Sequence, residues 1–548
     1  MAIQELLSEI EDNFRFLIIE VSKQLEDALY SLDNPADSLL ERVMLRDDHI
    51  DNLKGIIEKK VYLGMIPASS DSKRLMDFAK SIIIITANLE RIGDFCVNIV
   101  NQIQYFNDPS FIKNYDCKAF FDEINTVFSI IPDAVFRNDM FLAIDICHSE
   151  YSLDILYKTN FEAILKELHE HREIQNLLTT LFILRYLERI GDSLLNIGEA
   201  IISSIIGEKL KIHQIHALGE SLESTEYDYP DPDFSFESIG ETKSGCKIGI
   251  VQLSDREGDK REIIFKEGKR YKIEKEYHNI LKWKELSPGT PPEVHGLHIH
   301  SLNASLLLEK LEGLTFQEIL LKKDFSHLKK AINLLISHCR SLWSGTKSPG
   351  HPRSSLFSQL NRRMDDILKV HPDFDSPERH IGHLKEPSFK ELLRHAMQAE
   401  KSITVPFTVF IHGDFNIDNI ICNISDKKIH YVDLHRSAQS DYIQDSAVFL
   451  VSNYRVPRFD KRFRRKIDYT ARSFFEFTRS FALENNDETF NYRMTLGIIR
   501  SLLTSTRFHL NDEFARSMYH RALYLLSRLY DFRGDPKHFS FPESVLYY

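Results

Sequence analysis

The chain has 548 residues, which is too long for one ordinary domain and predicts two to four. Its 43% hydrophobic and 27% charged residues are typical of a soluble globular protein. The formal net charge of -12 and the pI of about 6.0 argue against a general nucleic-acid binder. We therefore expect a soluble multidomain protein with no nucleic-acid partner.

Targeting signals and cysteine usage predict a cytoplasmic location. The first residues, MAIQELLSEIEDNF, are acidic and lack a basic region, so no signal peptide is predicted. The aliphatic run Ile82–Ile85 is far too short to cross a bilayer, and no transmembrane segment is expected. The six cysteines include no CxxC pair, which argues against a zinc or redox motif and suits a reducing compartment.

Residues 1 to about 212 are predicted to be helical almost throughout, because proline and glycine are sparse and apolar residues recur at three and four. The segment contains an internal repeat, since Leu89–Asp94 (LERIGD) recurs 98 residues later as Leu187–Asp192. Each copy is followed by an asparagine at the same offset, Asn98 and Asn196. This spacing predicts a tandem of two three-helix bundles, at residues 1–108 and 109–212.

The repeated motif places two carboxylates on one helix face. Glu90 and Asp94 are four residues apart, and the second copy repeats them as Glu188 and Asp192. Like charges at this spacing repel unless a cation lies between them, so the pattern predicts a metal site with hard oxygen ligands. Salt bridges that involve the neighbouring arginines are the alternative. The upstream acids that could complete the sites are Asp47, Asp51 and Asp145.

The character of the sequence changes after residue 212. Residues 213–235 are acidic, polar and broken by two prolines, which predicts a linker. Residues 236–313 are predicted to form a small β-rich part, and residues 314–548 a larger helical part. The expected strands are 247–253, 262–266, 294–300, 305–310 and 407–411, with a helix at 272–285 and a hairpin at 420–432.

The stretch His412–Asn419, followed by Asp433, carries the strongest indication of chemistry. An acid at Asp414 can orient a hydroxyl nucleophile, and an amide at Asn419 and a second acid at Asp433 can hold Mg²⁺. Phosphoryl transfer needs this arrangement, because positioning and charge neutralisation supply most of its catalysis. We expect His412 to brace the loop. A polar loop with chance acids is the alternative.

The β-rich part should supply groups that anchor phosphate. Ile263–Lys266 resembles the third-strand lysine motif of kinases, which makes Lys266 the candidate phosphate-binding lysine. Its helix partner is expected to be Glu276, with Glu274 as the second choice, and an exposed edge-strand lysine is the alternative. A loop that covers phosphate is only weakly indicated, because no GxGxxG is present and an ordinary hairpin turn fits as well. Its candidate residues are Gly240, Ser244 and Gly245.

The first 212 residues resemble the PhoU family of phosphate-signalling proteins. The resemblance rests on the doubled LERIGD motif with its asparagine and on the repeat of nearly 100 residues. It implies two three-helix bundles in which a Glu-x-x-x-Asp motif of each repeat carries metal. The implied ligands of a second divalent metal or of an iron cluster are Glu90, Asp94, Glu188 and Asp192.

Residues 236–548 resemble the aminoglycoside phosphotransferase and choline-kinase-like family. The residues that carry this resemblance are His412–Asp414, Asn419, Asp433, Lys266 and the hinge-like Leu308–Gly313. It implies an α+β two-lobe protein-kinase-like fold that uses ATP and Mg²⁺ to phosphorylate a small-molecule hydroxyl. It also implies nucleotide contacts for Glu309 and Leu311, and a bracing role for Asp445. The chain departs from the family in its glycine loop and at Leu434–His435, after the metal-binding Asp433, where an aromatic residue or an acid is common.

Together these patterns predict a cytoplasmic fusion of a metal-binding PhoU-like domain with an ATP-dependent phosphotransferase that it regulates in a phosphate-related response. The acceptor pocket is expected to come from residues 345–400 and the C-terminal helices. Besides the acceptor we expect protein partners through the helical domain and a homo-oligomer. A non-catalytic phosphate-signalling adapter with a degenerate kinase domain is the main alternative. A metal-storage or scaffold protein would explain only the first third of the chain.

Overall fold

The computed structural model describes residues 2–65, 73–169, 173–207, 212, 214, 235–241, 246–254, 260–300, 302–350 and 352–547. The chain divides into two compact units, Met1–Glu267 and Gly268–Tyr548. This division falls inside a strand and not at the predicted linker, which lies outside the described residues except for Gln214 and Ser235. In the described part of the chain, no helix is both long and apolar enough to cross a membrane.

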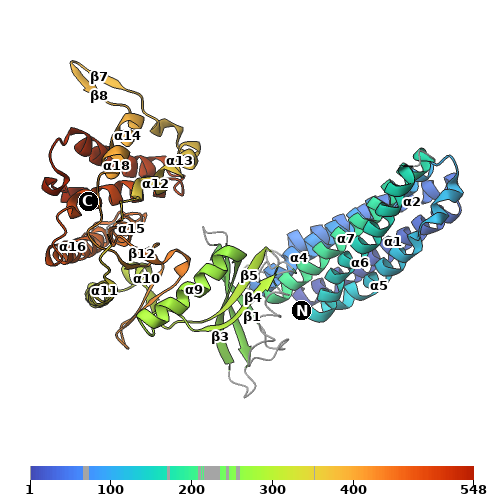
Figure 1. Cartoon of the computed structure of the whole chain (residues 1–548). Coiled ribbons are helices and arrows are strands. Elements are labelled where there is room, and N and C mark those ends of the chain that lie inside the picture. Colours follow the sequence, from blue (N-terminus) through green and yellow to red (C-terminus); the bar gives the residue numbers. More distant parts are fainter. Residues whose placement is uncertain are drawn as a thin grey trace. The chain divides into compact units, whose positions relative to one another are not determined.

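The helical part of the first unit consists of two three-helix bundles (Figure 1). The first contains α1 (Ala2–Asp33), α2 (Asp37–Lys60) and α4 (Lys73–Ile103), with the π-helical turn η1 (Val61–Met65) after α2. The second contains α5 (Cys117–Phe136), α6 (Met140–Leu168) and α7 (Ile174–Ile206), preceded by the 3-10 turn η2 (Pro109–Asn114). Within each bundle every helix packs against the other two. The predicted tandem of bundles is confirmed.

Capping chemistry fixes the start of α6 and the end of α7. The carboxylate of Asp139 accepts hydrogen bonds from the first backbone N–H groups of α6. Gly207 ends α7 in the left-handed conformation, with φ of +77°. The two motif helices α4 and α7 lie side by side, because the hydroxyl of Ser81 donates to the carbonyl of Ala200 at 2.7 Å.

The first unit also contains an antiparallel sheet of β1 (Ser235–Glu241), β2 (Lys247–Ser254) and β3 (Lys260–Lys269). The prediction that Gly240 belongs to the loop after the first strand is wrong, because Gly240 lies within β1. A register shift between Ser238 and Gly240 gives the reason, since irregular strand positions favour glycine. Ser244 and Gly245 lie outside the described residues.

The second unit is a mixed α+β region, as predicted. It opens with α9 (Arg270–Leu286), the antiparallel pair β4 (Val294–His300) and β5 (Asn303–Glu309), and the short β6 (Leu314–Thr315). The predicted strands at 294–300 and 305–310 and the helix at 272–285 are therefore observed to within two residues. Short β9 (Val409–Ile411) pairs with β12 (Ala438–Ser440), and β10 (Ile420–Asn423) pairs with β11 (Lys428–Tyr431).

Helices make up most of the rest of this unit, with a small hairpin of β7 (Arg379–Ile381) and β8 (Leu384–Glu386). They are α10 (Phe316–Lys322), α11 (Phe325–Thr346), α12 (Leu356–Asn361), α13 (Met364–Val370), α14 (Phe389–Glu400), α15 (Ile443–Tyr454), α16 (Lys461–Glu484), α17 (Phe490–Thr506) and α18 (Asp512–Asp531). Short 3-10 turns lie at η3 (Pro372–Phe374), η4 (Leu434–Arg436), η5 (Pro536–His538) and η6 (Glu543–Leu546).

Buried aromatic and charged side chains fix the core of this unit. Phe449 of α15 packs against Phe474 of α16, with ring centroids 4.3 Å apart. The fully buried guanidinium of Arg493 on α17 pairs with the carboxylates of Asp441 and Asp487. A buried charge needs such partners, because an unpaired one would lose its hydration without compensation.

Candidate active site

The predicted catalytic motif forms the loop between β9 and β10. Ile420 pairs with Tyr431 in the antiparallel register of the β10–β11 hairpin. One step outward, the carbonyl of Asn419 accepts a hydrogen bond from the N–H of Val432 at 3.1 Å. Asn419 and Asp433 therefore lie at the same end of the β10–β11 hairpin.

Asp445 and Gly413 fix the backbone of this loop. The carboxylate of Asp445, on α15, accepts hydrogen bonds from the N–H of His412 at 2.7 Å and from the N–H of Gly413 at 2.8 Å. These bonds agree with the bracing role expected of Asp445. Burial raises the pKa of Asp445 to about 7, although the two N–H groups act in the opposite direction. Gly413 has φ of +84°, and a Cβ there would lie 2.2 Å from the carbonyl oxygen of Arg436.

His412 is a structural part of the loop, as expected. Its Nε2–H donates to the carbonyl of Val432 at 2.9 Å, and its Nδ1 accepts from the N–H of Asp414 at 3.2 Å. Burial lowers the pKa of His412. Because both ring nitrogens have backbone partners, the imidazole holds the loop and is not placed to react.

The carboxylate of Asp414 is held from two sides. Its Oδ1 accepts a hydrogen bond from the side-chain amide of Asn416 at 2.7 Å. Its Oδ2 pairs with the guanidinium of Arg436 at 3.1 Å, and the Asp414 side chain keeps 19% of its surface exposed. Arg436 was not among the predicted site residues. It lies three residues after Asp433, but nothing in the sequence shows that the chain turns back onto Asp414.

Asn419 has the orientation that a metal ligand requires. Its side-chain N–H donates to the carbonyl of Asp414 at 2.9 Å. Among the described residues, its Oδ1 has no hydrogen-bond partner. An amide oxygen is a ligand that Mg²⁺ accepts. The side chain is therefore fixed by its nitrogen, and its oxygen remains for a ligand.

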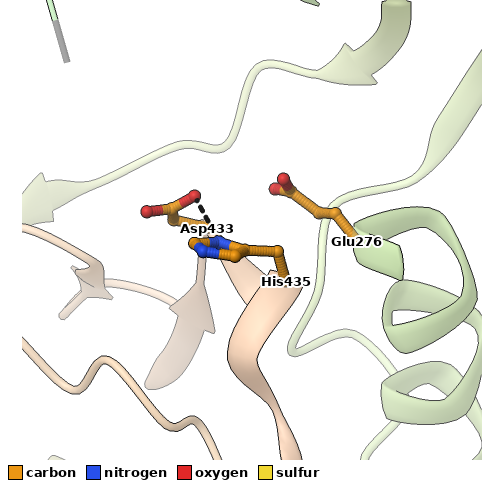
Figure 2. Close-up of side chains that lie close together, drawn as sticks. All are labelled: Glu276, Asp433 and His435. Carbon is orange, nitrogen blue, oxygen red and sulfur yellow. Dashed lines mark hydrogen bonds and ion pairs between the residues drawn. The ribbon is translucent and has the colours of Figure 1, made fainter. Parts of the chain in front are cut away.

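Asp433 belongs to a cluster with Glu276 and His435 (Figure 2). One ligand atom of each lies within 4.8 Å of the others, and the described residues contain no other such group of three His, Cys, Asp or Glu side chains. Asp433 has φ of +62°, a left-handed backbone that turns its carboxylate toward the cluster at the start of η4.

His435 orients the carboxylate of Asp433. Its Nδ1 lies 3.2 Å from Oδ1 of Asp433, and its Nε2 accepts from Nε–H of Arg436 at 3.1 Å. This pattern places the ring proton on Nδ1, as the donor to Asp433. The sequence had shown His435 only as a departure from the resembled family.

Two side chains of α9 fasten this helix to the segment after Asp433. Asn279 donates to the carbonyls of Leu434 at 2.7 Å and Ser437 at 3.2 Å. The indole N–H of Trp283 donates to the hydroxyl of Ser437 at 2.8 Å. Glu276, Asn279 and Trp283 are three and four residues apart and share one helix face. These bonds fix the position of Glu276 relative to Asp433.

The remaining predicted nucleotide contacts involve β3, α9 and the end of β5. Lys266 of β3 is buried, so the alternative of an exposed lysine is wrong. Lys266 and Glu276 belong to different compact units, and their pairing stays a prediction, whereas the second choice Glu274 pairs with Arg270 on its own helix at 2.9 Å. The proposed contacts of Glu309, at the end of β5, and of half-buried Leu311 also stay predictions.

In the first repeat, Glu90 and Asp94 of α4 face carboxylates of α2. Burial, and after it the charges of neighbouring carboxylates, raises the pKa of Asp47 and Asp94. The neighbours named by these interactions include Asp51, as the sequence suggested. The ammonium of Lys54 lies 3.1 Å from the carboxylate of Glu90 and is the cation that offsets this repulsion.

The second repeat has the same arrangement with different partners. Burial and the charges of Asp192 and Asp154 raise the pKa of Glu188, and Arg185 pairs with Glu188 at 2.6 Å. Oε2 of Glu188 is buried without a hydrogen-bond partner. The acids that α6 contributes are Glu150 and Asp154, in place of the suggested Asp145.

The glycine of each motif faces a neighbouring helix. A Cβ on Gly191 would lie 3.1 Å from the side chain of Leu153 and 3.5 Å from Cα of Glu150. A Cβ on Gly93 would lie 3.4 Å from the carboxylate of Asp47. Gly191 therefore lets α6 approach α7 closely, whereas at Gly93 a Cβ would make only an ordinary contact with α2.

Comparison with known proteins agrees with this architecture. Residues 18–103 and 122–201 match the PhoU domain. The phosphate-specific transport system accessory protein PhoU homolog of Clostridium acetobutylicum is 31% identical over 197 residues, which are 35% of this chain and 88% of the relative. The homolog of Pseudomonas aeruginosa is 27% identical over 230 residues, which are 40% of this chain and 93% of the relative.

The helical region is thus a tandem-bundle domain with paired carboxylates in each bundle. The chain belongs to the PhoU family through this region. The following α+β region is similar to an aminoglycoside phosphotransferase from Streptomyces rimosus. That structure is 19% identical, covers 53% of this chain and 92% of its own, and has a TM-score of 0.29.

Proposed function

We propose that this chain is an ATP-dependent phosphotransferase that phosphorylates a hydroxyl group of a small molecule, joined to a regulatory PhoU domain. The observation that carries the proposal is the loop with Asp414 and Asn419, which Asp445 and Gly413 hold, and the β10–β11 hairpin that brings Asp433 to the same end as Asn419. A loop that had lost its chemistry would have no need of all three polar groups together with this bracing.

In the proposed reaction the acceptor hydroxyl attacks the γ-phosphorus of ATP. A new O–P bond forms, the bond to the β,γ-bridging oxygen breaks, and ADP leaves. The hydroxyl proton passes to the carboxylate of Asp414 and from there to solvent. Asn416 and Arg436 keep that carboxylate in one orientation, which lowers the entropy cost of aligning the acceptor.

The chain's own residues fit a bound Mg²⁺ ion. Asn419 offers an amide oxygen that has no partner within the described part of the chain, and His435 orients the carboxylate of Asp433. These two residues would hold the ion, and when bound it would neutralise charge on the transferring phosphoryl group. Lys266 would bind the α- and β-phosphates with Glu276 as its partner. The remaining nucleotide contacts are assigned to Ser244, Gly245, Glu309 and Leu311.

We predict that ATP raises the thermal stability of the protein much more with Mg²⁺ than without it. A ligand that binds only the folded state stabilises it in proportion to its affinity, and the metal completes the ATP site. Asp433→Ala should remove the difference. Thermal unfolding with ATP, with and without Mg²⁺, provides the measurement.

Asp426→Ala serves as the matched control, because Asp426 is an exposed acid in the turn of the same hairpin. It should retain the full effect of Mg²⁺. Equal stabilisation by ATP with and without Mg²⁺ in the unaltered protein would instead favour the non-catalytic adapter.

The PhoU domain is proposed to bind a divalent metal or an iron cluster through Glu90, Asp94, Glu188 and Asp192, and to regulate the kinase-like region. The buried, unpartnered Oε2 of Glu188 is suited to a ligand role. Within the first unit, Gln214 donates to Glu267 at 2.7 Å and accepts from Lys247 at 2.6 Å. Because Glu267 follows Lys266 directly, these bonds offer a route from the helical domain to the proposed phosphate-binding lysine.

The double substitution Glu90→Ala with Glu188→Ala should lower the metal content of the full-length protein and shift its affinity for ATP or the acceptor. A coupling between two sites is typically worth about 5- to 150-fold in affinity. Gln214→Ala should retain the metal and shift the affinity in the same direction. Elemental analysis and ATP titration provide the two measurements.

The control pair is Glu41→Ala with Glu162→Ala, which removes exposed carboxylates from α2 and α6. It should change neither measurement. If the first pair loses metal while every binding and kinetic constant matches the unaltered protein, the two regions are only tethered.

A further inference from the structure

Three arginines gather with Arg436 around Asp414. Arg500 lies in α17 and Arg507 follows that helix directly, so their spacing of seven residues places them on one helix face. Arg363 directly precedes α13, and α17 packs against both α12 and α13. These are the segments from which an acceptor pocket was expected, but the sequence did not show that their arginines converge.

Arg500 is the buried member of this group, whereas Arg363 and Arg507 are half-buried, and the guanidinium of Arg507 lies 4.4 Å from the ring centroid of Phe508. Among the described residues, Arg363, Arg500 and Arg507 have no carboxylate within ion-pair distance. Arg500 is only 4% exposed, and the Nε groups of Arg500 and Arg507 are buried without a hydrogen-bond partner. A guanidinium that is desolvated and unpaired is strongly unfavourable, which indicates that a ligand completes the cluster.

The electrostatics show that the guanidinium groups are neighbours. Burial, together with the positive charges of Arg507 and Arg436, lowers the pKa of Arg363 to about 10. Burial likewise lowers the pKa of Arg500 to about 10, with Arg363 and Arg436 acting in the same direction. Burial also lowers the pKa of Arg507. Asp414 is the carboxylate that acts on all three, so the positive cluster adjoins the proposed catalytic acid.

A chain of hydrogen bonds fixes Arg500 relative to the catalytic loop. Its Nη2 donates to the side-chain carbonyl of Gln359 at 2.6 Å, and the amide of Gln359 donates to Gln444 at 3.0 Å. Gln444 in turn donates to the carbonyl of Gly413 at 3.0 Å. These bonds fix the position of the Arg500 guanidinium relative to the loop that contains Asp414.

The nearby carboxylates are already engaged. Asp414 pairs with Arg436, and Asp445 accepts two backbone N–H groups. Asp366 acts on Arg507 only from beyond ion-pair distance. An excess of positive charge therefore remains beside the position that the acceptor hydroxyl must occupy.

We propose that the acceptor is an anionic alcohol, whose phosphate or carboxylate group is held by Arg363, Arg500 and Arg507 while its hydroxyl lies at Asp414. This rests on the proposed function and names the substrate class of that same site. Guanidinium groups suit the oxygens of both anions, because their N–H donors form paired, charge-assisted hydrogen bonds. The same charges would repel an acceptor that carries an amine or a quaternary ammonium group.

The first test measures binding alone. The full-length protein is loaded with a non-hydrolysable ATP analogue and Mg²⁺, and inorganic phosphate is titrated by calorimetry. The double substitution Arg363→Gln with Arg507→Gln, which alters half-buried positions, should weaken phosphate binding by roughly 10- to 100-fold, as expected for lost bonds to a charged group. Arg479→Gln, at an exposed arginine paired with Glu543, should leave it unchanged. Phosphate binding that is equal in all three proteins would overturn the proposal.

The second test compares acceptors in matched pairs that differ by one charged group: glycerol with glycerol 3-phosphate, and ethylene glycol with glycolate. The anionic member of at least one pair should have the higher kcat/KM, and the double substitution should raise its KM more than it lowers kcat. The pair that shows the preference indicates whether the acceptor carries a phosphate or a carboxylate group.

Turnover that favours neutral or aminated alcohols would contradict the proposed substrate class but would leave the proposed phosphotransferase activity standing. An equal fall in kcat for all acceptors would also contradict that substrate class, since the arginines would then act on the transferring phosphoryl group. Phosphate binding at the arginines without any ATP turnover would support the anion site and count against the proposed function.

Discussion

Replacing Asp414 by asparagine is expected to lower turnover by about two orders of magnitude or more, as for loss of a general base. The substitution retains size and polarity but removes the charge that aligns the acceptor hydroxyl and accepts its proton. ATP affinity should change little, because this carboxylate is not assigned to the nucleotide. Steady-state kinetics and ATP titration of the full-length protein separate the two effects.

Asp418→Asn is the matched control, since Asp418 is an exposed acid in the same loop. It should leave turnover close to that of the unaltered protein. If Asp414→Asn turns over a genuine acceptor at the normal rate, the role given to Asp414 is refuted. Loss of turnover in both variants would point to the charge of the loop as a whole.

Asp445→Ala is expected to destabilise the second unit by about 2–5 kcal/mol. The substitution leaves the N–H groups of His412 and Gly413 buried without an acceptor, and each unsatisfied donor costs about 1–3 kcal/mol. The only two tryptophans, Trp283 and Trp343, are buried in the second unit, so their fluorescence reports its unfolding separately. Denaturant titration followed by this signal provides the measurement.

Asp445→Asn should recover part of the lost stability, because its carbonyl oxygen can still accept one of the two hydrogen bonds. Asp512→Ala, at an exposed acid in the first turn of α18, is the control for removing a carboxylate. Unchanged stability in Asp445→Ala would mean that the loop backbone finds other acceptors, and the bracing role would be wrong.

Local signals explain which features could be predicted from the sequence. The LERIGD repeat and its helical periodicity predicted the tandem bundles, and short β-like runs predicted β2, β3, β4, β5, β9 and the β10–β11 hairpin. The short strands β6, β7, β8 and β12 were not predicted. Gly240 was misplaced because a glycine marks a strand irregularity as readily as it marks a turn. His435 and Arg436 could not be assigned, since their contacts depend on how η4 turns back toward the loop before β10.

The arginine cluster shows the same limit more strongly. Arg363, Arg500 and Arg507 come from two segments that are separated by more than a hundred residues, and each is an ordinary charged residue in its own helix or turn. Only the packing of α17 against α12 and α13 makes them neighbours. Sequence motifs identify catalytic residues that lie within one loop, whereas a substrate-binding surface formed by tertiary packing cannot be recognised from local sequence patterns.

The glycine of the second LERIGD copy has a consequence for the ancestry of the helical region. Relative to the motif glutamate of the same repeat, the facing acids on α6, Glu150 and Asp154, lie five residues later in the sequence than Asp47 and Asp51 on α2. The connections between the helices therefore differ in length between the two halves. In the second bundle the close approach of α6 to α7 depends on glycine, because a methyl group at Gly191 would press on Leu153. A duplicated ancestor could therefore change the length of its loops, while a side chain at Gly191 would have moved α6 away from α7 and separated their acids.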